Sequence, residues 1–87
     1  MIITNAIVTA YCAGVLTANQ HIPVEGVTIA APRSVPFNTL VCIDKRWYRV
    51  DDRTHRRYDG RWDIYMTSRW RCLLWGLQRH TITIIRP

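Results

Sequence analysis

The residues of this chain best suited to acid–base chemistry are its carboxylates, of which it has only six. Asp51, Asp52, Asp59 and Asp63 fall within one arginine-rich stretch. Asp52 ends one expected strand and Asp63 opens the next, so the two side chains can share one end of a folded sheet. Two nearby carboxylates help one of them to keep its proton, as a general acid must. On spacing alone, a salt-bridged basic loop with aspartates as turn residues is the better explanation.

Asp63 has unusual neighbours for an aspartate. It stands between Trp62 and Ile64, with Tyr65 two positions later. Apolar neighbours raise the pKa of a carboxyl group by desolvation, which suits a general acid, whereas the charge of Arg61 opposes the rise. Trp62 and Tyr65 could stack on the face of a sugar ring, but aromatic residues at such positions more often belong to the core.

The histidines and cysteines form no second catalytic or metal-binding pattern. His21, His55 and His80 are scattered, and the cysteines show neither a CxxC pair nor zinc-ligand spacing with them. We therefore expect no metal and no cofactor. Cys12, Cys42 and Cys72 stand beside apolar residues, which favours buried free thiols, and one disulfide with a leftover thiol is the alternative.

The composition indicates one basic, folded domain that spans residues 1–87. Of the residues, 48% are hydrophobic, and the net charge is +6 from eleven arginines, Lys45 and the six acids. A basic excess favours a polyanionic partner such as nucleic acid, wall or lipid phosphates, or acidic glycan. We expect no membrane insertion and no signal peptide, because the apolar runs are short and Met1 to Ala10 lacks a basic start.

The elements that must position the carboxylates are short strands between turn signals. Asn38 and the pair Asp44-Lys45 suit left-handed turn positions. Thr67 or Ser68 can cap a helix that puts Trp70, Leu73 and Leu74 on one face and ends at Gly76. Many short strands in a small chain favour a closed barrel. The expected strands are Ile7–Cys12, Val27–Ala30, Leu40–Ile43, Trp47–Val50, Ile64–Met66 and Thr81–Ile85.

Five short blocks follow one another in a characteristic order. They are Val8-Thr9-Ala10-Tyr11-Cys12, Thr17-Ala18-Asn19-Gln20, Val35-Pro36-Phe37-Asn38-Thr39, Val50-Asp51-Asp52-Arg53-Thr54 and Trp62-Asp63-Ile64-Tyr65-Met66. This order resembles the three-aspartate domain family, which is similar to the catalytic barrel of membrane-bound lytic transglycosylase A and to stationary-phase survival and resuscitation-factor-like domains. The resemblance runs from about Ile7 to Ile85. It implies a mainly β fold, a small six-stranded double-psi β-barrel with one short helix before the last strand.

The resemblance also implies roles for individual residues. Asp63 resembles the catalytic acid, Asp52 its supporting carboxylate and Thr17 a polar residue on the opposite wall. The chain departs from the family pattern where Ala31 replaces the first aspartate and where a glycine-rich stretch after Asp52 is replaced. The replacing loop is arginine-rich, and its candidate substrate-binding residues are Arg53, Arg56, Arg57 and Arg61.

The function implied by the resemblance is cleavage of peptidoglycan glycan strands by a metal-independent lytic transglycosylase. The short chain looks like a phage-encoded version, either an endolysin or a part of a tail. Such a protein would be made in the cytoplasm and act at the cell wall after release or delivery. Its partners would be other lysis or tail proteins. The alternative is a catalytically silent glycan-binding module. A nucleic-acid-binding protein is a third candidate, because the chain is basic and has aromatic residues among its arginines, but no nucleic-acid motif is recognisable.

Overall fold

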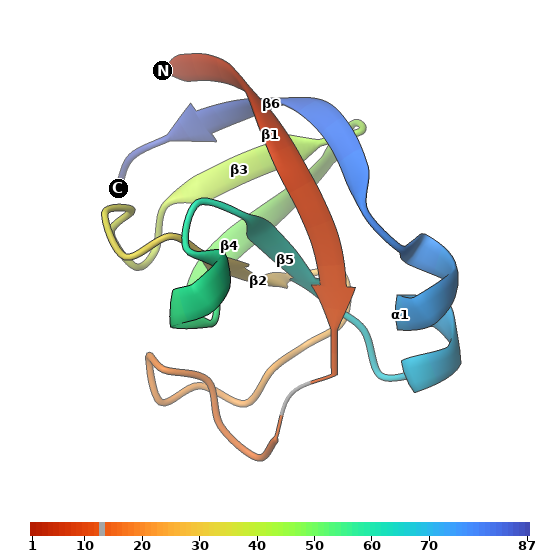
Figure 1. Ribbon diagram of the computed structural model, residues 1–87. Coiled ribbons are helices and arrows are strands. Elements are labelled where there is room, and N and C mark those ends of the chain that lie inside the picture. The colour runs from red at the N-terminus through yellow and green to blue at the C-terminus, as the bar shows by residue number, and fades with distance from the viewer. Residues whose placement is uncertain (13) are drawn as a thin grey trace.

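The structure is a computed structural model that describes residues 1–12 and 14–87 (Figure 1). Within these residues the chain forms six strands, one short α-helix before the last strand and one 3-10 turn. The elements are β1 (Ile2–Tyr11), β2 (Thr28–Ala31), β3 (Leu40–Ile43), β4 (Arg46–Arg53), η1 (Arg56–Tyr58), β5 (Trp62–Tyr65), α1 (Arg69–Trp75) and β6 (Gln78–Ile85).

The strands close into a barrel in the order β1-β5-β2-β4-β3-β6. The pairs β1–β5 and β2–β4 are parallel, and the remaining neighbours are antiparallel. Closure leaves none of these strands with an unpaired edge, which is how a small β domain avoids pairing with other chains. The predicted mainly β fold, a six-stranded barrel with a short helix before its last strand, is therefore confirmed.

The barrel is filled by every second side chain of its strands. Ile29 of β2 lies opposite Val50 of β4 and Ile64 of β5, and all three are buried. Val8 and Trp62 form another buried pair across β1 and β5. Residues between these positions face the outside of the barrel, because successive side chains of a strand point to opposite faces. The outward positions of β1, β2 and β5 are the ones that matter for the site.

The predicted turns occur at the expected residues. Asp44 and Lys45 both have positive φ and connect β3 to β4, and Asn38 has φ 70°. Ser68, not Thr67, caps α1, with its side-chain oxygen accepting the N–H of Arg71. Gly76 ends the helix with φ 64°, a value that favours glycine.

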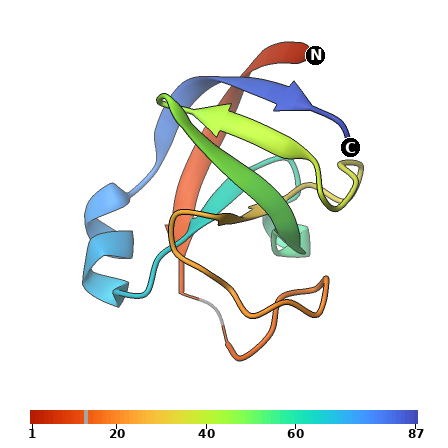
Figure 2. The same ribbon diagram turned by 180° about the vertical axis from the view of Figure 1, so that it is seen from behind.

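Some strands differ from their predicted bounds because tertiary pairing extends them. β1 starts at Ile2, since its first half pairs with β6, and β4 continues to Arg53. The predicted apolar face of α1 does not pack, and Trp70, Leu73 and Leu74 are exposed. The connection of residues 14–27 projects from one end of the barrel (Figure 2). No helix in the described part of the chain is long and apolar enough to cross a membrane.

Candidate functional site

The sheet register places Asp52 and Asp63 on either side of Ala30. Ala30 of β2 lies opposite Asp63 of β5 and opposite Asp52 of β4. Residues that face one another in adjacent strands point to the same side of a sheet, and these positions alternate with the buried ones, so both carboxylates lie on the outside of the barrel. Thr9 of β1 lies opposite Asp63 and shares that face. The two aspartates therefore share the outer wall of the barrel, with β2 between them.

A β-bulge at Asp51 is what turns Asp52 to this face. Ile29 pairs with Val50, whereas the next residue, Ala30, pairs with Asp52, so Asp51 is an extra residue in β4. Without the bulge Asp51 would take the place opposite Ala30. Bulges bend a strand locally and re-aim its side chains, and they recur beside active sites.

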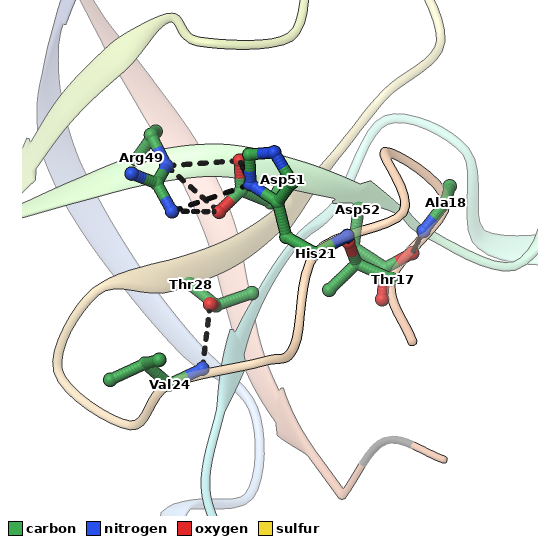
Figure 3. A network of polar contacts seen from close by, with 8 residues as sticks. All are labelled: Thr17, Ala18, His21, Val24, Thr28, Arg49, Asp51 and Asp52. Atoms are coloured by element: carbon green, nitrogen blue, oxygen red, sulfur yellow. Dashed lines mark hydrogen bonds and ion pairs between the residues drawn. The ribbon is translucent and has the colours of Figure 1, made fainter. Parts of the chain in front are cut away.

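The bulge residue is anchored by an ion pair in which the carboxylate is buried and the arginine is partly exposed (Figure 3). Asp51 has a fully buried side chain, and the Nε of Arg49 donates to both carboxylate oxygens at 3.0 and 2.9 Å. The Nη2 of Arg49 lies 2.8 Å from Oδ2, and the Nδ1 of His21 lies 3.3 Å from Oδ1. These partners compensate the loss of hydration that a buried carboxylate suffers. Asp51 is therefore structural, and His21 helps to hold the connecting loop against it.

Asp63 has the environment expected of a proton donor. It is half-buried, and Thr9 Oγ1 donates to its Oδ1 at 2.9 Å. Burial raises the pKa of Asp63 above its ordinary value, and the charge of Asp52 adds to the rise. The Thr9 hydroxyl and the charge of Arg61 act in the opposite direction without cancelling the effect. Within the described residues, Oδ2 of Asp63 has no hydrogen-bond partner, so this oxygen is free to carry the proton.

Asp52 is held by three donors. The hydroxyl of Tyr11 donates to Oδ2 at 2.8 Å, and the backbone N–H groups of Ala18 and Arg53 donate to Oδ1, both at 2.9 Å. All three contacts use Asp52 as an acceptor, which is the role of an ionised carboxylate. Burial and the neighbouring Asp52 raise the pKa of Tyr11 far above its usual value, so Tyr11 stays a donor. The result is an acceptor group fixed on the same barrel face as Asp63.

Thr17 builds the loop that caps this site. Its side chain is buried, and its hydroxyl accepts the backbone N–H of His21 at 3.1 Å (Figure 3). This bond shapes the turn that aims the next N–H, that of Ala18, at Asp52. Thr17 thus supports Asp52 through the loop. Its own side chain is buried, so it cannot make the predicted contact with a substrate.

Trp62 does not have the substrate-facing position that its type suggested. Its side chain is only 5% exposed and lies in the barrel core, because Trp62 alternates with the outward Asp63 along β5. Tyr65 is half-buried on the outer face and packs edge-on against Tyr11, with ring centroids 5.8 Å apart. Of the two aromatic residues proposed for sugar stacking, only Tyr65 presents part of its ring.

The four predicted arginines differ in what their side chains contact. Arg53 stacks on Phe37, 3.9 Å from the ring centroid, and Arg61 stacks on Tyr58 at 4.6 Å. Arg56 and Arg57 are exposed in η1. The loop therefore combines two guanidinium groups held against aromatic rings with two that extend into solvent.

The site also includes three groups that were not predicted from the sequence: Thr9, Tyr11 and the Ala18 N–H. Thr9 and Tyr11 share a face because alternate residues of a strand do, but a single sequence does not say which strand they meet. A backbone N–H leaves no signal in the sequence. The cysteine prediction also needs correction, because Cys12 is exposed and the others are only partly buried.

The site has the composition of an acid–base centre. No group of three or more His, Cys, Asp or Glu side chains gathers as metal ligands in residues 1–12 and 14–87. What the outer face offers is a carboxyl group with a raised pKa beside a carboxylate held as an acceptor. Comparison of the chain with protein-family models, with the curated proteins and with solved structures gives no match.

Proposed function

We propose that this protein is a lytic transglycosylase of the three-aspartate type, with a double-psi barrel, that cleaves the β-1,4 bond between N-acetylmuramic acid and N-acetylglucosamine in peptidoglycan. The observation that supports this best is the pairing of Asp63 with Asp52 on an outer barrel wall. A half-buried carboxyl group with a raised pKa can hold a proton where an exposed aspartate would lose it. Both carboxylates are only partly buried, which leaves part of each available to a substrate.

The reaction begins with the proton on Oδ2 of Asp63. Asp63 gives this proton to the glycosidic oxygen as the bond to C1 of the muramyl residue breaks. Asp63, now a carboxylate, takes the proton of the muramyl 6-hydroxyl while that oxygen bonds to C1, which leaves a 1,6-anhydro end and restores the acid. Water does not attack, so this scheme needs one acid–base group and not the acid and base of an inverting hydrolase.

The other site residues hold Asp63 ready for these steps. Thr9 orients the carboxyl group through Oδ1 and leaves Oδ2 toward the substrate. The charge of Asp52 favours the protonated form of Asp63, and it also stabilises positive charge that develops at C1. Tyr11 and the Ala18 N–H keep Asp52 in place.

The arginine-rich loop supplies binding. Arg56 and Arg57 are exposed and can pair with the carboxylates of peptide stems or with anionic wall polymers. Ala31, which replaces an aspartate of the family pattern, is fully buried in β2, so its position belongs to the fold and not to the reacting face. We place the protein in a phage lysis or tail assembly that acts at the bacterial cell wall.

Mass spectrometry of purified sacculi incubated with the protein tests this proposal. We expect soluble muropeptides with 1,6-anhydro ends, and we expect none from the matched Asp63→Asn variant. Retention of the protein on sacculi without release of fragments would instead identify a catalytically silent glycan-binding module. Products with reducing muramyl ends would identify a hydrolase, and a gel shift with DNA at moderate salt but no wall binding would identify a nucleic-acid-binding protein.

A further inference from the structure

Two cysteines from opposite ends of the chain meet on the surface. Cys12 directly follows β1, Cys72 lies on α1, and their sulfur atoms are 3.6 Å apart. The two positions are separated by 60 residues, so this contact is a product of the tertiary fold. The helix lies beside the end of β1 (Figure 1), where Trp75 Nε1 donates to the carbonyl of Val8 at 3.1 Å. A disulfide has an S–S distance of about 2.05 Å, so the two sulfur atoms must come about 1.5 Å closer to bond.

The pair is accessible to a small oxidant. Cys12 is exposed, and both cysteines line a surface hollow of about 580 Å³ together with Tyr11, Arg69 and Leu73. Burial and the contact with Cys12 raise the pKa of the Cys72 thiol to about 11. Cys72 is therefore a protonated thiol at neutral pH, and the exposed Cys12 is the one placed to react first.

We propose that Cys12 and Cys72 are a disulfide-forming pair that locks α1 to the end of β1 under oxidising conditions. Cys42 is the leftover thiol, because it lies on β3 between Trp47 and Thr83 of the neighbouring strands and contacts no other sulfur in the described residues. The bond joins the helix to the residue that follows Tyr11, the donor to Asp52. This inference does not depend on the proposed function, although disulfides persist outside the cytoplasm, where a wall-cleaving enzyme works.

The reaction with a low-molecular-weight disulfide such as oxidised glutathione balances in two exchanges. The Cys12 thiolate attacks one sulfur of the oxidant, and the first thiol leaves as a mixed disulfide forms. Cys72 then loses its proton and attacks the Cys12 sulfur, which expels the second thiol. The protein loses two electrons and two protons, and the oxidant takes up both as it is reduced to two thiols.

The test treats the reduced full-length protein with oxidised glutathione and measures intact mass, thiols alkylated after denaturation, and the melting temperature. We expect a mass lower by two hydrogens, one alkylated thiol, and a melting temperature raised by on the order of 10 °C, because a long loop is closed in the unfolded chain. The matched control Cys42→Ser keeps the mass change and the rise in melting temperature. Cys12→Ser loses both, and its exposed position lets it fold.

Three outcomes overturn the proposal: a wild-type protein that keeps all its thiols after oxidation, a stable glutathione adduct in place of the internal bond, or a disulfide that peptide mapping assigns to Cys42. None of these measurements uses peptidoglycan, so they test the disulfide independently of the transglycosylase activity.

Discussion

Replacing Asp52 by asparagine tests whether the two aspartates are coupled by charge. Asparagine keeps an oxygen where the N–H groups of Ala18 and Arg53 point, and its amide group can donate to the Tyr11 oxygen. The fold is therefore retained while one negative charge is lost. Without that charge, Asp63 gives up its proton more easily, so its pKa falls.

The sheet register sets the size of this fall. Ala30 stands between the two aspartates, so their Cα atoms lie two strand spacings apart, about 10 Å. At this distance two unit charges interact by about 1.7 kcal/mol for an effective dielectric constant of about 20. Salt at 0.1 M, with a Debye length of about 10 Å, lowers this roughly threefold. Loss of an interaction of about 0.6 to 1.7 kcal/mol therefore lowers the pKa of Asp63 in the variant.

Two assays measure the shift. NMR of the carboxyl carbons follows the titration of Asp63 directly, and the alkaline limb of the pH–rate profile for muropeptide release reports the same group in the enzyme reaction. Both midpoints should move to lower pH by similar amounts, less at high salt. Asp44→Asn is the matched control, because it removes a carboxylate from the β3–β4 turn, at the opposite end of β4 from Asp52. Asp44 has a positive φ, which asparagine also accepts. An unmoved Asp63 midpoint, or one that rises, refutes the coupling.

Further predictions concern the acid, the loop and the helix. Asp63→Asn should lower muropeptide release by about 100-fold or more. Folding raises the pKa of Asp63, so ionised Asp63 costs stability, in full once the pH is above its pKa in the folded protein. The variant lacks this charge and should melt at or above the wild-type temperature at pH 7. A large drop in melting temperature would contradict this. The double variant Arg56→Ala with Arg57→Ala should bind sacculi more weakly than wild type at low salt, in a pull-down assay, and the difference should vanish at high salt; Arg86→Ala is the control. Arg71 and the Thr67 N–H lower the pKa of Glu25 to about 2, so the bond between Glu25 and α1 contributes stability above about pH 4.5 and loses it as the pH falls toward 2. Glu25→Gln should therefore lower the melting temperature slightly at pH 7 and have no effect near pH 2, and an equal effect at both would show that charge is not the cause.

The local features of this fold were predictable because their causes are local. Alternation of apolar and polar residues marks the strands, and the turns need residues that accept positive φ, as Asn38 and Asp44-Lys45 do. Ser68 caps a helix through its own side chain. Burial does raise the pKa of Asp63, but Trp62 and Ile64 face the core on the other side of β5, so this burial comes from the assembled fold and not from the chain neighbours.

The assembled site was not predictable in the same way, because it depends on which strands meet and in what register. The single extra residue Asp51 decides which aspartate of β4 faces Asp63, and a change of one residue in register reverses every side chain of a strand. The same parity puts Trp62 inside the barrel and Asp63 outside. The contact between Cys12 and Cys72 spans most of the chain, and pairings between distant segments leave no periodic pattern in a single sequence, so they arise only when the barrel closes.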